Sequence, residues 1–365
     1  MSLVCRTLAT FAVVLSLVAC GSDADDSSAD ADDSSADTAA LDAVLVDFES
    51  DEPGCAGAVG VDGEVVWTGS AGAESLEPLS AIDDETVFDI GSTSKQFTAT
   101  AVLLLVAQGA VALDDTLREY MPDLPTWADE ITIDHLLHHQ GGIPDYFGLL
   151  EAEMTERTTV EDALEVIKGV TELEFEPGST YEYSNSGYFL LSQVVESVTG
   201  QTLGDFLEEE VFGPLELDAV MDATPSVSGH ATSYSPDEDD ESGFVVADSL
   251  WEQTGDGAVW TTPAELVRWA PELWDSQLSD GLAEARLADA VETGEGDTYG
   301  GGIRIAELDG VTTLSHSGAW SGFQTELVVL PEEKLAAAIS CNRDDDDLDP
   351  TELANELIAA WRDAS

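Results

Sequence analysis

Hydrophobic runs of strand length lie at the two ends of the chain and flank a long stretch with helical spacing. Near the N-terminal end, residues 56–61 and 64–68 are rich in β-forming residues. They are joined by Asp62-Gly63, a pair typical of hairpin turns. Near the C-terminal end, turn residues separate four further predicted strands, which cover residues 302–308, 311–316, 323–330 and 335–341.

Between these groups, apolar positions recur with the period of a helix. The spacing predicts helices over about 39–50, 92–109, 186–199 and 203–211. Asp349-Pro350 opens a last predicted helix with apolar residues on one face. Residues 225–257 are polar and rich in Gly and Asp, so we expect a loop there.

Strands at both chain ends with helices between them indicate an α+β fold, arranged as an α/β sandwich. One antiparallel sheet is built from both chain ends, and the last helix covers it. We expect one domain over 39–365, with the sheet part at about 39–90 and 295–365 and an inserted, mainly helical part at about 91–294. A cleft between the two parts is the default place for a site.

The first 38 residues predict export and anchoring. Arg6 precedes an apolar run over 8–18, which is too short to span a bilayer. Leu17-Val18-Ala19-Cys20 resembles a bacterial lipobox, so we expect a signal peptide over 1–19 and a lipid on Cys20. An ordinary secretory signal cut nearby is the alternative. The implied location is the outer face of a bacterial-type membrane, where the lipid is the only part of the protein expected to enter the membrane.

Residues 20–38 predict an acidic, disordered tether. The heptapeptide Asp-Ala-Asp-Asp-Ser-Ser-Ala occurs twice, at 23–29 and 30–36, without any aromatic or branched apolar residue. Such a stretch cannot bury a core.

The net charge of -65 belongs to the folded part as well, since residues 41–365 hold 69 of the 76 acidic residues. Such a surface repels phosphate, which excludes nucleic acid as a partner. Self-repulsion is screened at about 1 M salt, where the Debye length is about 3 Å. We therefore expect a salt-adapted protein, whose only lysines are Lys95, Lys168 and Lys334.

Ser92 and Lys95 are the candidate catalytic pair. Gly91-Ser92-Thr93-Ser94-Lys95 precedes a long apolar run, so the serine stands at a helix start and the lysine one turn later on the same face. A serine needs a neighbouring base, and burial lowers the pKa of an ammonium enough to supply one. The alternative is that Ser92 is only an N-cap and Lys95 a solvated residue.

Two further motifs complete a pattern. Tyr183-Ser184-Asn185 precedes a predicted helix, and His316-Ser317-Gly318-Ala319 ends a predicted strand. The order S-x-x-K, Y-x-N, H-x-G resembles the serine β-lactamase and penicillin-binding-protein superfamily, most closely its class C branch. The resemblance covers about residues 45–345 and implies a β-lactamase/transpeptidase-like fold without a cofactor.

The resemblance implies a role for each matching residue. Ser92 forms an acyl-enzyme, Lys95 accepts its proton, and Tyr183 is a second acid/base whose pKa the ammonium lowers. Asn185 positions the lysine and the substrate amide. The N–H groups of Ser92 and Ala319, the latter following Gly318, form an oxyanion hole.

His316 stands where penicillin-hydrolysing members usually carry a lysine. A mostly neutral histidine favours neutral esters or peptides over β-lactams. On its own, His316 is equally consistent with a surface histidine at a sheet end, Tyr183 with a packing residue and Asn185 with an N-cap.

Other residues invite weaker interpretations. His135, His138 and His139 suggest a metal site, but matching ligands are not evident, so we expect none. Asp256 is either a cleft residue or, preferably, part of a turn. The resemblance makes the strands of Cys55 and Cys341 neighbours, and export would favour a disulfide between them.

The sequence thus predicts a serine hydrolase that cleaves small esters or D-amino-acid-type amides and peptides. One alternative is a catalytically silent, penicillin-binding-like surface lipoprotein that binds cell-wall peptide or a protein partner. Another is a surface protein that binds metal or other ions through its histidines and aspartates.

Overall fold

The computed structural model describes residues 38–46, 48–150, 157–224, 229–237, 239–240, 242–308, 310–345 and 348–364. The expected signal peptide, Cys20 and the tether up to residue 37 lie outside these ranges. Contacts divide the chain into Met1–Ala36 and Asp37–Ser365, and the description below concerns the second unit. In the described part, no helix has both the length and the apolar character needed to cross a membrane.

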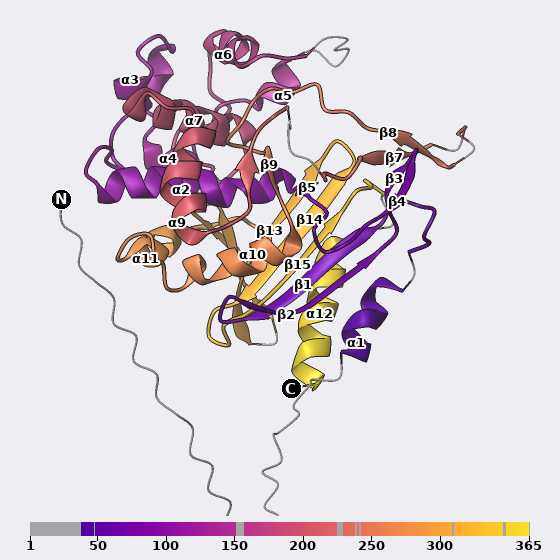
Figure 1. Cartoon of the computed structure of the whole chain (residues 1–365). Coiled ribbons are helices and arrows are strands. Elements are labelled where there is room, and N and C mark those ends of the chain that lie inside the picture. Colours follow the sequence, from indigo (N-terminus) through magenta and orange to yellow (C-terminus); the bar gives the residue numbers. More distant parts are fainter. Residues whose placement is uncertain are drawn as a thin grey trace, which may run out of the picture. The chain divides into compact units, whose positions relative to one another are not determined.

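One eight-stranded antiparallel sheet organises this unit (Figure 1). Its strands run in the order β10-β11-β12-β13-β14-β15-β1-β2, so strands from both ends of the chain are neighbours. The strands are β1 Cys55–Val61, β2 Glu64–Ala71, β10 Val291–Glu292, β11 Thr298–Gly300, β12 Ile303–Leu308, β13 Val311–Trp320, β14 Phe323–Leu330 and β15 Leu335–Cys341. The predicted fold class is confirmed.

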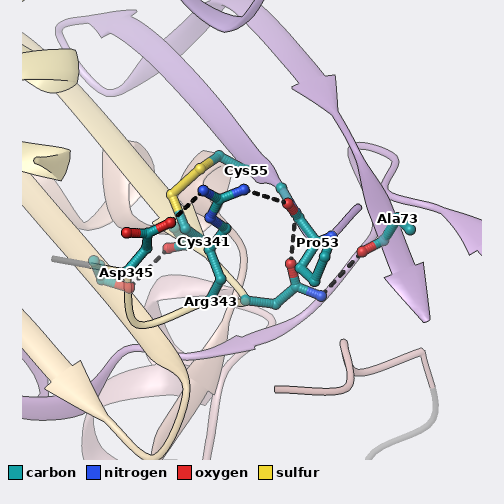
Figure 2. The surroundings of a disulfide bond; sticks show 10 residues. Pro53, Cys55, Ala73, Cys341, Arg343 and Asp345 are labelled. Atoms are coloured by element: carbon teal, nitrogen blue, oxygen red, sulfur yellow. Dashed lines mark hydrogen bonds and ion pairs between the residues drawn. A yellow bond between two sulfur atoms is a disulfide. The ribbon is translucent and has the colours of Figure 1, made fainter. Parts of the chain in front are cut away.

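The junction between the two chain ends is closed covalently. Cys55 faces Cys341 in the β1–β15 register, and a disulfide joins them across a separation of 286 residues. Beside it, Arg343 Nη1 donates to the carbonyl of Pro53 at 3.4 Å, and Arg343 Nη2 contacts Asp345 Oδ2 at 2.5 Å (Figure 2). The disulfide therefore joins two paired strands, and polar contacts of Arg343 lie beside it.

Helices cover both faces of the sheet. α12, Pro350–Ala364, packs on β14 and β15 and contacts α1, Ala39–Asp42, which continues into the 3-10 turn η1, Ala43–Leu45. α10, Pro263–Trp269, packs on β1, β2 and β15. Separate apolar clusters fill the two faces, as expected for a three-layer arrangement.

The inserted part is built around α2, Lys95–Ala107, which follows the 3-10 turn η2, Gly91–Ser94. α2 is buried over its first eleven residues, so the helix predicted over 92–109 forms the centre of this region. The other elements are α3 Leu117–Tyr120, η3 Thr126–Asp129, α4 Ile133–Leu137, α5 Tyr146–Leu149, α6 Val160–Lys168, α7 Asn185–Thr199, α8 Leu203–Leu207, η4 Glu208–Phe212, α9 Gly213–Leu215, η5 Ala270–Leu273 and α11 Leu282–Leu287.

Several elements differ from the prediction because they are very short. Residues 225–257 are not all loop, since they contain the paired strands β7 Tyr234–Pro236 and β8 Phe244–Val246. A small sheet of order β5-β9-β6 was also not predicted. Its strands, and the paired strands β3 and β4, are β3 Ala73–Leu76, β4 Leu79–Ala81, β5 Phe88–Asp89, β6 Val220–Met221 and β9 Val259–Thr261.

β13 is four residues longer than predicted, and this brings Ala319 to the end of the sheet. Ser321 and Gly322 have φ of 34° and 83°, and a two-residue hairpin loop with both φ positive has the form of a type I′ turn. In such a hairpin the closing pair, Trp320 and Phe323, exchanges hydrogen bonds. The preceding pair, Ala319 and Gln324, does not, so the N–H of Ala319 points away from β14.

Candidate active site

The turn η2 and the start of α2 bring Ser92 and Lys95 together. Lys95 Nζ lies 3.0 Å from Ser92 Oγ, and the lysine side chain is completely buried. Ser94 Oγ accepts the N–H of Val259 at 3.0 Å, and Thr98 Oγ1 donates to the carbonyl of Gly255 at 2.7 Å. These two bonds flank Lys95. They connect the start of α2 to Val259, the first residue of β9, and to Gly255, which precedes β9.

Three acceptors hold the Lys95 ammonium. Besides Ser92 Oγ, these are Asn185 Oδ1 at 2.9 Å and the backbone carbonyl of Asp256 at 2.6 Å. Burial lowers the pKa of Lys95 to about 8, while the carboxylates of Asp256 and Asp145 oppose this shift. Lys95 therefore gives up its proton near pH 8, well below the ordinary value for a lysine.

Asn185 is oriented by a carboxylate that sequence reasoning did not identify. Asp145 Oδ2 accepts both the backbone N–H and the side-chain Nδ2 of Asn185, each at 3.0 Å. Because Nδ2 is engaged there, Oδ1 faces Lys95. Ser184, not Asn185, is the N-cap of α7, since its hydroxyl accepts the N–H of Gly187. The N-cap alternative for Asn185 is therefore wrong.

Tyr183 lies against the same lysine. Its ring centroid is 4.9 Å from Lys95 Nζ, and its hydroxyl is buried without a geometrically good hydrogen bond to any described residue. Burial raises the pKa of Tyr183 above its ordinary value, and the nearby Ser92 hydroxyl only partly opposes this rise. The expectation that the ammonium lowers this pKa is wrong, because desolvation of the phenolate is the larger effect.

The contact between η2 and β13 depends on two glycines. A Cβ at Gly318 would lie 1.9 Å from the carbonyl oxygen of Ile90, and one at Gly91 would lie 2.8 Å from the nitrogen of Ala319. Gly91 also has a φ of 51°. The close approach brings Ser92 and Ala319 together in the lining of one cavity.

His316 and Gly318 are not part of that lining. The cavity lining contains Ser92, Asn185 and Ala319, but not His316, Gly318, Lys95 or Tyr183, the last two lying against Ser92 and Asn185 instead. His316 is 3% exposed and packs between Tyr299 and Tyr183. Burial, together with the charge of Lys95, lowers the pKa of His316 to about 3. His316 is thus a neutral, buried residue, which excludes the alternative of a surface histidine.

The cavity beside Ser92 has a volume of about 110 Å³. Two acidic and four aromatic side chains are among its fourteen lining residues. The lining residues are Asp89, Gly91, Ser92, Tyr146, Phe147, Asn185, Ala223, Trp251, Gln253, Asp256, Gly257, Ala258, Ala319 and Trp320. It adjoins a second cavity of about 350 Å³, which shares Asp89, Ala223 and Trp320 with it.

Two buried aspartates face this cavity. Asp256, which the sequence favoured as a turn residue, is 6% exposed, and its Oδ2 accepts the hydroxyl of Tyr146 at 2.8 Å. Asp89 is 3% exposed, and its Oδ1 accepts the N–H of Gly91 at 2.9 Å. Burial raises the pKa of Asp89 to about 7, the charge of Asp256 adds to the rise, and the Gly91 bond opposes it. Burial also raises the pKa of Asp256.

The three histidines near α4 do not form a metal cluster. His135 caps α4 by accepting the N–H of Thr132, His138 Nδ1 pairs with Asp134, and His139 stacks on Tyr183 with ring centroids 4.4 Å apart. Throughout the residues that the structure describes, no group of three or more His, Cys, Asp or Glu side chains is arranged to hold a metal ion.

Comparison with known proteins agrees with this site. The model of the Beta-lactamase family matches residues 38–360. Penicillin-binding protein 4* of Bacillus subtilis (strain 168) is 25% identical over 321 residues, which cover 82% of this chain and 69% of that protein. The D-aminopeptidase of Brucella anthropi is 28% identical over 315 residues, covering 84% of this chain. The chain spans only 59% of the length of that enzyme.

A solved structure supports the same fold. The D-amino acid amidase from Ochrobactrum anthropi SV3, complexed with D-phenylalanine, superposes with a TM-score of 0.77 and 20% sequence identity. The match covers 89% of this chain and 99% of the amidase. Together with the family model, it confirms the resemblance that the three motifs indicated.

Proposed function

Because the chain belongs to the beta-lactamase family, an enzyme family of serine hydrolases, we propose that it works through an acyl-enzyme on Ser92. The observation that carries this proposal is the 3.0 Å separation between Lys95 Nζ and Ser92 Oγ. A fully buried lysine whose pKa is about 8 is a competent base for that hydroxyl.

The chemical steps follow from the positions of these groups. Neutral Lys95 takes the proton of Ser92 as Oγ forms a bond to the substrate carbonyl carbon. The N–H groups of Ser92 and Ala319 stabilise the oxyanion. As the tetrahedral intermediate collapses, the bond to the leaving group breaks and Tyr183, whose raised pKa keeps it protonated, supplies the leaving group's proton. Lys95 then returns a proton to Tyr183. In deacylation, water attacks the carbonyl carbon of the acyl-enzyme while neutral Lys95 takes a proton from the water. The bond between that carbon and Ser92 Oγ breaks, Tyr183 protonates Oγ, and Lys95 again returns a proton to Tyr183.

We propose amides and small esters of D-amino acids as substrates. Similar proteins include D-aminopeptidases and a D-amino acid amidase. The neutral, buried His316 supplies no fixed cation for the carboxylate of a β-lactam. The catalytically silent, peptide-binding protein remains the alternative, and the experiment below separates the two.

We also propose that the protein is exported and anchored by a lipid on Cys20, on the strength of the lipobox-like Leu17-Val18-Ala19-Cys20. Mass spectrometry of the mature N-terminus tests this proposal. A diacylated cysteine is expected in the native chain and should be absent from the Cys20→Ser variant. An unmodified N-terminus in the native chain would contradict lipidation.

The decisive experiment compares the full-length protein with its Ser92→Ala variant in molar KCl, because the acidic surface needs screening. Hydrolysis of a p-nitrophenyl ester and of D-alanine p-nitroanilide is measured, and intact mass is recorded during turnover. An adduct on Ser92 and loss of both activities in the variant are expected. Equal rates for both proteins would remove Ser92 from the mechanism. Binding of a D-amino-acid peptide without turnover or an adduct would favour the silent protein.

A further inference from the structure

We propose that the cavity beside Ser92 recognises an ammonium group on the acyl part of the substrate, with Asp89 and Asp256 as the specificity-determining residues. This inference rests on the proposed function, since it names the kind of acyl group that reaches Ser92. The preferred substrates are then amides or esters of amino acids with a free amino group.

The carboxylate of Asp89 has one oxygen without a donor. One of its oxygens, Oδ1, accepts the N–H of Gly91 at 2.9 Å. The other, Oδ2, has no donor among the residues that the structure describes, although the side chain is 3% exposed. A carboxylate oxygen that is removed from bulk water needs a donor. Asp89 lines the cavity, so a ligand is able to supply that donor.

Two polar side chains near the aspartates have their donors engaged. Tyr146 donates its hydroxyl to Asp256, and Gln253 donates Nε2 to the carbonyls of Thr158 and Thr159. The second pair of bonds fixes the amide of Gln253, whose buried Oε1 has no partner among the described residues. Of the polar groups that Asp89, Asp256 and Gln253 contribute, those left unused are therefore acceptors. An ammonium has three donors and no acceptor, which makes it the matching ligand.

The charge of the lining residues also favours a cation. The cavity has two carboxylates and no basic side chain among them. Lys95 is not a lining residue and must be neutral when it accepts the serine proton. Burial raises the pKa values of Asp89 and Asp256, and a neighbouring carboxylate adds to each rise. The N–H of Gly91 opposes the rise at Asp89, and the charge of Lys95 and the Tyr146 hydroxyl oppose it at Asp256. A bound cation would stabilise both ions, whereas a substrate carboxylate would be repelled.

Aromatic side chains complete the cavity and suit the rest of such a ligand. Phe147 packs against Trp251 with ring centroids 4.4 Å apart and against Trp320 at 5.4 Å. Tyr146 adjoins Phe147 at 4.4 Å. These rings offer apolar surface to a substrate side chain, and their faces attract a cation.

The test measures binding apart from catalysis. Full-length Ser92→Ala protein is titrated calorimetrically at pH 7 in molar KCl with D-phenylalaninamide and with 3-phenylpropanamide, which lacks only the amino group. We expect the amine-bearing amide to bind at least about tenfold more tightly, as a hydrogen bond between charged groups allows. A second substitution, Asp89→Asn, should remove most of this ratio while keeping an acceptor for the Gly91 N–H.

Asp248→Asn is the matched control, because Asp248 is an exposed acid that lines only the adjoining cavity. It should leave the affinity ratio unchanged.

A measurement without any second substitution gives an independent check. Raising the KCl concentration should reduce the affinity ratio, because salt screens the attraction between the ammonium and the carboxylates.

Equal affinities for the two amides, no measurable binding of either, or a ratio that Asp89→Asn leaves intact would each overturn the inference. None of these results bears on Ser92 as the nucleophile, which the ester assay and the adduct mass decide on their own.

Discussion

Tyr299 donates its phenol hydrogen to Nε2 of His316 across 2.9 Å. The direction of this bond follows from the other ring nitrogen, because Nδ1 lies 2.7 Å from the carbonyl oxygen of Ser317 and must carry the proton there. His316 is thus held as one neutral tautomer, with both nitrogens occupied and no room for a second proton.

The first prediction is that replacing His316 by lysine does not create a penicillin-hydrolysing enzyme. The new ammonium would be buried beside Lys95 and without a carboxylate partner in the observed arrangement. We expect a loss of about 3–5 kcal/mol in the free energy of unfolding, typical of an uncompensated buried charge. Denaturant unfolding in KCl and hydrolysis of benzylpenicillin measure the two effects. His230→Lys is the control, because His230 is exposed. A stable His316→Lys protein that is acylated by penicillin would contradict this interpretation.

The second prediction concerns pH. Lys95 accepts a proton only in its neutral form, and its pKa of about 8 lies below the ordinary value of 10.5. kcat/KM should therefore rise with pH and level off above an inflection near 8. Lys95→Arg should lower kcat by at least about 100-fold, because general-base catalysis is lost, whereas Lys168→Arg should have no such effect. A profile that is flat between pH 6 and 9 would argue against Lys95 as the base.

The third prediction tests the approach of β13 to the nucleophile. Gly318→Ala would place a Cβ against the carbonyl of Ile90, so η2 and β13 must separate. Displacing the N–H of Ala319 should lower kcat by about 10²–10³, the usual effect of losing one oxyanion donor. Gly148→Ala is the matched control, since a Cβ there meets nothing within 4 Å. Unchanged kcat in Gly318→Ala would show that the close contact is dispensable.

The fourth prediction concerns the disulfide. Removing it frees a loop with a sequence separation of 286 residues, and the chain-entropy model assigns such closure a stabilisation of about 5–6 kcal/mol. The double variant Cys55→Ser, Cys341→Ser should unfold at a lower denaturant concentration than the oxidised protein. Reduced wild-type protein should behave like the variant. Alkylation of both Cys55 and Cys341 in unreduced protein, located by peptide mass spectrometry, would show that the bond is absent in solution.

The sequence predicted the parts of the site that are local. Ser92 and Lys95 share one helical turn, so their contact at 3.0 Å follows from spacing. The strands over 323–330 and 335–341 were predicted with the observed bounds, because each is a continuous apolar run between clear turns. The two-residue strands around β9 carry no such pattern and exist only through tertiary pairing.

The acidic residues of the site could not be picked out in the same way. Asp89, Asp145 and Asp256 are three among 76 acidic residues, most of which are expected on a solvated surface. Asp256 follows Gly255, which has a φ of 103° and lies so close to α7 that a Cβ there would meet Ser192 and the carbonyl oxygen of Tyr188. That contact joins segments far apart in the chain. Neither the secondary-structure propensity of the residues nor the periodicity of apolar positions predicts such a contact.

The prediction for Tyr183 was wrong for a related reason. It weighed the attraction of the ammonium and left out the cost of burying a phenolate, which only the packing of Tyr183 reveals. The raised pKa suits a group that donates protons more than one that accepts them.

The pairing of β1 with β15 also determines when the protein can fold. The first long strand to leave the ribosome has β2 on one side, but its other partner is the last strand to be synthesised. The strands from the two chain ends cannot join into one sheet until residue 341 has been synthesised. Contacts between segments far apart in the sequence slow folding, so we expect this protein to fold slowly. During that interval the edge of β1 that later pairs with β15 leaves its backbone N–H and C=O groups without their partners, and such an edge is a template for pairing with another chain.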